Sequence, residues 1–153
     1  MSLLKILCDI LAADGWRFNL DQRNEIVQLE VRGVNANLRL IVYVDEEQES
    51  FLCNTHTNLK IPYAKRLQIC EFMNRVNYEM VNGNFEMDME DGEIRYRTSL
   101  DLSGAEASKD QILNLIWNGA QSFDTFFPGM MELLYENCTP EQAVSLCMVE
   151  NNV

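Results

Sequence analysis

The chain of 153 residues contains one histidine, His56, and Cys53 lies three residues before it. Histidine nitrogen and cysteine sulfur are common zinc ligands, and the same two side chains serve as base and nucleophile in cysteine hydrolases. A zinc site needs two further ligands, and no second cluster of Cys and His accompanies this pair. Residues three apart in an extended strand point to opposite faces. We therefore predict no metal site and place His56 in a sheet or loop.

Other catalytic patterns are also missing from the sequence. It has no G-x-S-x-G nucleophile elbow, no Walker-type phosphate loop and no G-x-G-x-x-G motif. Carboxylates such as Glu86, Asp88 and Glu90 alternate in patterns that place them on solvated faces, which disfavours acid catalysis. We predict a protein without catalytic residues and without a cofactor.

The charge balance is strongly acidic, with 24 Asp and Glu against 12 Lys and Arg and a formal net charge of -12. This charge repels phosphate backbones and anionic membrane surfaces, so nucleic acid and membrane partners are not expected. It either keeps a cytoplasmic protein soluble or attracts a basic segment of a partner.

We interpret residues 1–14 as a helix rather than a signal peptide, and no run of about 18 apolar residues exists.

The first half of the chain changes from helical to alternating periodicity. Apolar residues recur at helical spacing over residues 2–14, and Gly15 follows where a left-handed cap would end a helix. Trp16 and Phe18 indicate a short strand. Residues 25–44 alternate, and a turn at residues 34–35 pairs Val31 with Leu38 and Glu30 with Arg39. The apolar pairs on one face and the polar pairs on the other support the same register. A shift of one residue would turn the apolar side chains to solvent.

The second half predicts a helix, a hairpin and two terminal helices. The residues around 51–55 continue the sheet, and Pro62 opens a broadly apolar helix. Asp91-Gly92 is a favoured hairpin turn. It pairs Met87 with Tyr96, Asp88 with Arg95 and Glu86 with Arg97. Repulsion between the glutamates beside the turn can widen it to a four-residue loop. Capping boxes at residues 108–111 and 139–142 start two more helices, and Pro128-Gly129 is expected to break or kink the first of them.

Large apolar side chains concentrate in the helix that begins at Pro62 and around Pro128-Gly129. They form either core packing or a surface for a dimer or another partner, for which Met and aromatic groups are well suited. The candidate surface residues are Phe72, Met73, Phe126, Phe127, Met130 and Met131.

Three segments carry a resemblance to a known family: residues 69–77 (ICEFMNRVN), residues 83–88 (GNFEMD) and residues 91–97 (DGEIRYR). The sequence resembles the YbjN family of bacterial sensory transduction regulators, whose fold is similar to that of type III secretion chaperones. The resemblance covers nearly the whole chain and implies a single domain over residues 1–153. It also implies an antiparallel sheet of about five strands covered by helices, in the order α-β-β-β-(β)-α-β-β-α-α. Within this α+β fold, Asp91, Gly92, Arg95 and Arg97 are structural residues of the second hairpin.

The family resemblance further implies frequent dimerisation and a role in holding or regulating other proteins. We therefore expect a non-enzymatic binding module that acts through an apolar sheet or helix surface. Its expected partners are another protein and a second copy of the chain. The alternative is a regulatory domain that senses a small ligand in a pocket between sheet and helices. We also expect Asn74 and Asn77 to tie their helix to the adjacent hairpin through backbone hydrogen bonds.

Overall fold

The computed structural model describes residues 1–150, with side chains described as far as Met148. Six antiparallel strands form one sheet in the order β1-β2-β3-β4-β6-β5, so the expected α+β class is confirmed. The strands are β1 (Phe18–Asp21), β2 (Ile26–Arg32), β3 (Asn37–Asp45), β4 (Ser50–Lys60), β5 (Asn84–Met87) and β6 (Glu93–Asp101). The helices are α1 (Leu3–Ala13), the short 3-10 turn η1 (Tyr63–Lys65), α2 (Arg66–Glu79), α3 (Lys109–Tyr135) and α4 (Pro140–Glu150).

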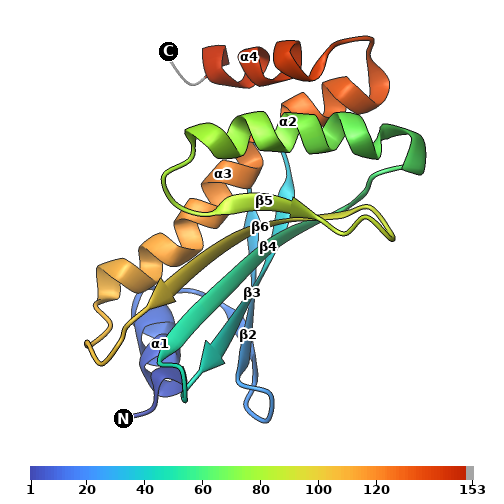
Figure 1. Cartoon of the computed structure of the whole chain (residues 1–153). Helices are drawn as coiled ribbons and strands as arrows, with labels where there is room; N and C mark the ends of the chain where they lie inside the picture. The colour runs from blue at the N-terminus through green and yellow to red at the C-terminus, as the bar shows by residue number, and fades with distance from the viewer. Residues whose placement is uncertain (151–153) are drawn as a thin grey trace.

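The helices lie on one face of the sheet and beyond its β5 edge (Figure 1). The helix α3 packs along β6, β4 and β3, and α1 lies beside its first half. At the other end, α2 contacts β5, and α4 packs on both α2 and α3. The buried apolar side chains of the strands alternate toward α1 and α3, as Val27, Leu40 and Cys53 do. The opposite sheet face carries mostly polar and charged side chains, and no helix in residues 1–150 covers it.

The first hairpin has the predicted register. Val31 is opposite Leu38, and Glu30 is opposite Arg39. The turn is held from outside the hairpin, because the Asp124 carboxylate of α3 accepts hydrogen bonds from the backbone N–H groups of Val34, Asn35 and Ala36 at 2.8–3.1 Å. A Cβ at Gly33 would lie 2.1 Å from that carboxylate, so the turn needs glycine at this position.

The predicted register of the second hairpin is wrong by two residues. Met87 lies opposite Ile94 rather than Tyr96, and Glu86 lies opposite Arg95 rather than Arg97. The loop spans residues 88–92, and Gly92 adopts a positive φ of 80°. Its N–H donates to the Asp88 carbonyl, while its own carbonyl accepts from the N–H of Ile61. The loop is therefore fixed by the chain after β4 as well as by its own turn residues.

The expected break at Pro128 does not occur, because α3 runs through it as one helix. Proline removes the N–H that would bond the carbonyl four residues earlier, which is that of Asp124. Here the Asn35 side-chain amide donates to this carbonyl at 3.0 Å. The hairpin turn thus satisfies the acceptor that Pro128 leaves open, and the helix continues.

Both predicted capping boxes are present. The Ser108 hydroxyl accepts from the N–H of Gln111, whose side chain accepts from the N–H of Ser108. Thr139 and Gln142 make the same pair of bonds at the start of α4. The helix after Pro62 starts later than expected, because residues 63–65 form a 3-10 turn before α2 begins.

Candidate functional site

The structure places most of the predicted partner surface in the core. Phe72 and Met130 are fully buried, and Met73 and Phe126 are each 5% exposed. These four residues cannot form a docking surface in this fold, so that part of the prediction is wrong. The reason is that α2 packs against β5, α3 and α4 of its own chain, which covers its apolar side. Phe127 and Met131 are half-buried and pack against the core.

The outward side of α2 carries exposed apolar residues that the sequence analysis did not single out. Leu67 is 78% exposed and Tyr78 is 89% exposed, and Tyr63, just before the helix, is 84% exposed. Leu67 and Tyr78 are eleven residues apart, close to three helical turns, so they lie on one face. The buried residues Ile69 and Val76 lie on the other side of the helix. Helical spacing is the signal that could have separated the two sets.

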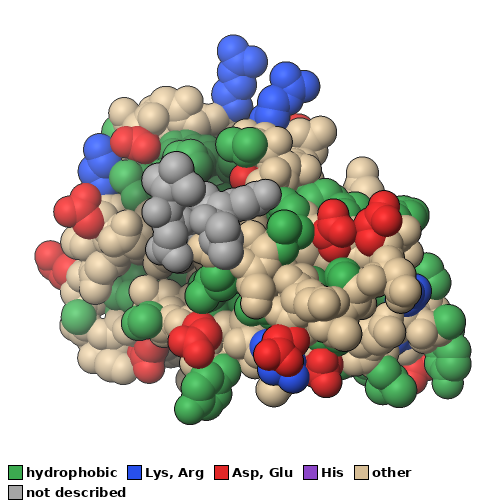
Figure 2. All heavy atoms as spheres, turned by 90° about the horizontal axis from the view of Figure 1, so that it is seen from above, with side chains coloured by type: hydrophobic (Ala, Val, Ile, Leu, Met, Phe, Trp, Pro, Cys, Tyr) green, Lys and Arg blue, Asp and Glu red, His purple; other side chains and the backbone are tan. Residues whose placement is uncertain are grey.

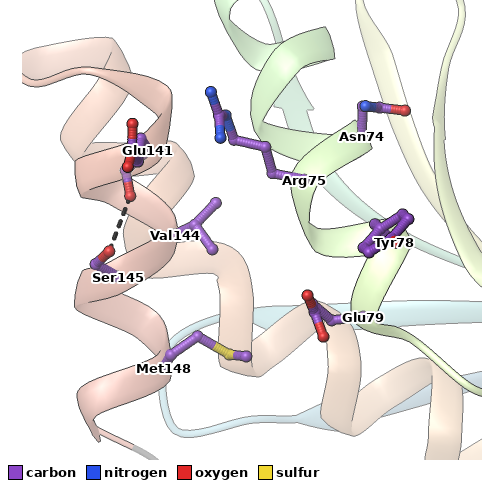
Figure 3. A pocket seen from close by; sticks show the side chains of 8 residues that line it. All are labelled: Asn74, Arg75, Tyr78, Glu79, Glu141, Val144, Ser145 and Met148. Carbon is purple, nitrogen blue, oxygen red and sulfur yellow. Dashed lines mark hydrogen bonds between the residues drawn. The ribbon is translucent and has the colours of Figure 1, made fainter.

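A groove of about 400 Å³ lies between α2 and α4, next to Tyr78. Its lining residues are Asn74, Arg75, Tyr78 and Glu79 from α2, and Glu141, Val144, Ser145 and Met148 from α4. In Figure 3, Val144 and Met148 extend from α4 into the space between the helices, while Arg75 reaches from α2 toward α4. The groove therefore combines apolar side chains in its interior with charged groups of both signs along its edges.

Small residues set the depth of this groove by letting α4 approach closely. Ala143 and Cys147 are the buried side chains of α4 within the described part of the chain. A Cβ at Gly129 would lie 2.7 Å from the Phe72 ring and 2.8 Å from the Cys147 sulfur. Because α4 rests on these small contacts, its larger residues Val144 and Met148 stay at the surface beside α2.

Asn77 fixes α2, and thus one wall of the groove, against the sheet edge. Its Oδ1 accepts from the N–H of Phe85 at 2.7 Å, and its Nδ2 donates to the Phe85 carbonyl at 3.0 Å. The expected tie between helix and hairpin is confirmed for Asn77. Asn74 is exposed and instead lines the groove.

The face that bears α2 and α4 is chemically mixed. Figure 2 views the molecule from above Figure 1 and shows apolar side chains interspersed with acidic ones rather than one continuous apolar area. The Arg75 guanidinium lies 3.5 Å from the Glu71 carboxylate one turn earlier on α2. Such a face suits a partner that brings both apolar and charged groups.

Comparison with known proteins gives one family match. The family model "YbjN: Putative bacterial sensory transduction regulator" matches residues 3–132. The chain belongs to the YbjN family. Among solved structures, the fold is similar to the crystal structure of YbjN, "a putative transcription regulator from E. coli", with a TM-score of 0.61. The two sequences are 12% identical, and the match covers 79% of this chain and 85% of the other. At this identity the match supports only the fold. No curated protein sequence matches this chain.

The YbjN family match ends within α3, before α4 begins. One wall of the groove, formed by α2, therefore belongs to the matched part, and the other wall, formed by α4, lies beyond it. The hairpin segment that carried the resemblance is inside the match, and its charged side chains form ion pairs. Glu86 pairs with Arg97 at 2.7 Å and with Arg95 at 3.3 Å, and Lys60 pairs with Asp91 at 2.9 Å. The backbone N–H of Glu93 and the Lys60 ammonium lower the pKa of Asp91.

In this YbjN-family chain, Cys53 and His56 lie on opposite faces of β4, as their spacing predicts. Cys53 is in the core, where burial raises the pKa of its thiol to about 12. His56 is on the face without helices, and its Nδ1 lies 3.3 Å from the Glu93 carboxylate without the alignment of a hydrogen bond. Burial is the main cause that lowers the pKa of His56. The thiol is thus protonated and on the opposite face of the sheet from the imidazole, so the two do not form a nucleophile and base.

Two further observations concern residues 1–150. No three His, Cys, Asp or Glu side chains in this range gather in a way that could hold a metal ion. None of the helices in it is both long and apolar enough to cross a membrane.

Proposed function

We propose that this YbjN-family chain is a non-enzymatic regulatory module that binds a segment of another protein in the groove between α2 and α4. The observation that carries the proposal is the exposure of Leu67 and Tyr78 on one face of α2, together with a groove that Tyr78 helps to line and whose interior is apolar. Large apolar side chains that are more than three-quarters exposed favour a partner that covers them. The family description as a regulator of sensory transduction agrees with this role.

The charges of the groove and of the chain suggest the chemistry of the partner segment. Glu79 and Glu141 lie on its two walls and outnumber the one lining cation, Arg75, and the whole chain has a net charge of -12. A segment with Lys or Arg beside one or two apolar side chains would be attracted at long range and could place those side chains next to Val144 and Met148. We place this interaction in the cytoplasm.

Site-specific photo-crosslinking tests the proposal. A photoreactive residue at Tyr78 should capture a defined partner from the native cell, whereas the same residue at Val34 should not. Val34 is a matched control because it is apolar and 95% exposed but lies on the first hairpin turn and does not line the groove. The captured protein should be lost when Leu67 is replaced by Ser. Equal capture at both positions would contradict the proposal.

A second copy of the chain is one partner that this face could accept. The expected homodimer is tested by light scattering after size-exclusion chromatography over a range of protein concentrations. We expect a dimer mass for the wild type and a monomer mass for Leu67→Glu, because a charge in an apolar interface is strongly unfavourable. A monomer mass for the wild type at high micromolar concentration would exclude the homodimer and leave binding of a different protein.

A further inference from the structure

A second hollow lies on the sheet face that the helices leave open. It occupies about 540 Å³ where β2, β3 and β4 meet, and it is polar. The side chains that matter here are Glu30, Arg32, Asn37, Arg39, His56 and Asn58. It is separate from the groove between α2 and α4, with which it shares no lining residue.

Two arginines of this hollow have no carboxylate partner. Arg95 and Arg97 on the same sheet face pair with Glu86. Within residues 1–150, neither Arg32 nor Arg39 makes an ion pair. Glu30 is opposite Arg39 in the sheet, yet their charged groups are not within ion-pair distance. In a chain with twice as many acidic as basic residues, two unpaired guanidinium groups in one hollow are an unusual concentration of positive charge.

A buried histidine lies beside these arginines. His56 is 6% exposed and lies in register between Arg39 on β3 and Arg95 on β6. Its Nδ1 makes no hydrogen bond and lies 3.3 Å from the Glu93 carboxylate. His56 is therefore a buried titratable group that lines the hollow beside Arg39, and an anion bound there would favour its protonated form.

We propose that this hollow binds a small oxyanion, a carboxylate or a phosphate, with Arg39 and Arg32 as the cationic contacts and His56 at its floor. A planar guanidinium can donate two parallel hydrogen bonds to such a group, which gives both strength and orientation. The long-range field of the chain repels anions, so saturable binding would have to come from these local contacts. The inference goes beyond the proposed protein-binding function and stands independently of it.

The single histidine gives the test a direct readout at the site. NMR of the imidazole Cε1–H group of His56 reports one signal, which is titrated with inorganic phosphate and, separately, with succinate at constant ionic strength set by chloride. We expect a saturable shift of this signal and a rise of the His56 pKa. The Glu93 carboxylate raises this pKa and the charges of Arg39 and Arg95 lower it, so a bound anion would act in the same direction as Glu93.

Matched arginine substitutions decide whether the hollow is responsible. Arg39→Gln should weaken binding at least tenfold, and Arg23→Gln on the exposed turn between β1 and β2 should leave it unchanged. Both side chains are exposed, so neither change should disturb folding. Saturation by phosphate alone, by succinate alone or by both supports the site and identifies its ligand class. Shifts that never saturate, or that are equal in both variants, mean an adventitious ion only and overturn the proposal.

Discussion

The side chain of Asn77 supplies hydrogen-bond partners to the backbone at the β5 edge of the sheet. Within an edge strand, alternate residues direct both their N–H and C=O groups away from the sheet, where they would lack partners. Phe85 in β5 is such a residue, and the Asn77 amide meets both of its groups. The amide therefore replaces a missing neighbouring strand and holds α2 at a fixed distance from β5.

Replacing Asn77 by Ala should lower the free energy of unfolding by about 1 to 3 kcal/mol, because the Phe85 N–H loses its partner and the Phe85 carbonyl keeps only the 3.4 Å bond from the Asn84 amide. Urea denaturation followed by circular dichroism measures the change. Asn74→Ala is the matched control, since Asn74 is on the same helix but exposed, and it should change stability by less than about 0.5 kcal/mol. Equal effects of the two substitutions would show that the Asn77 contacts contribute nothing specific.

His56 should make stability fall in acid. Burial lowers its pKa below the ordinary value of 6.5, so the folded state holds the imidazole neutral while the unfolded chain accepts a proton more readily. The contribution is complete above pH 6.5 and is lost as the pH falls through the folded pKa. Between about pH 7.5 and about pH 5.5, wild type should lose more unfolding free energy than His56→Gln. Parallel pH curves for the two proteins would contradict this.

The two hairpins show which part of an element can be predicted from its side chains. The register of β2 and β3 was predictable because a shift of one residue reverses the two faces, and the polar pairs agreed with the apolar ones. A shift of two residues keeps every side chain on its face, so alternation could not distinguish the predicted register of β5 and β6 from the observed one. The wider loop is selected by the backbone bond from the Ile61 N–H to the Gly92 carbonyl and by the bond from the Arg66 guanidinium to the Met89 carbonyl. Both involve segments distant in sequence.

Continuity of α3 depends on a contact that no local pattern reveals. Asn35 donates to the Asp124 carbonyl, which Pro128 leaves without a helical partner. Asn35→Ala should lower the unfolding free energy by about 0.5 to 1.5 kcal/mol in the wild type. In a Pro128→Ala background, where residue 128 regains an N–H that can bond this carbonyl, the same change should cost less. A double-mutant cycle measures the difference, and strictly additive effects would refute the link between the turn and the proline.

At the scale of the whole molecule, the partner surface was the hardest feature to predict. The sequence identified apolar helices correctly, but it could not show that α2 is enclosed by β5, α3 and α4 of the same chain. Phe72 and Met130 therefore lie in the core, and the proposed partner surface is formed by the exposed Leu67 and Tyr78 instead. The hollow at His56 was missed for a related reason, since only the folded sheet brings Arg39 of β3 beside it.

The long helix α3 should make the two ends of the molecule unfold together. Its 27 residues span about 40 Å, from α1 at one end to α2 and α4 at the other. Trp16 and Trp117, whose rings are 5.1 Å apart, report on the first end through fluorescence. Cys147, which is buried against α3, reports on the second through thiol labelling read by peptide mass spectrometry, which separates it from the other free cysteines. We expect the same urea midpoint from both probes, because breaking α3 at any point exposes core on both sides. Labelling of Cys147 well below the fluorescence midpoint would instead show that α4 detaches first as a separate unit.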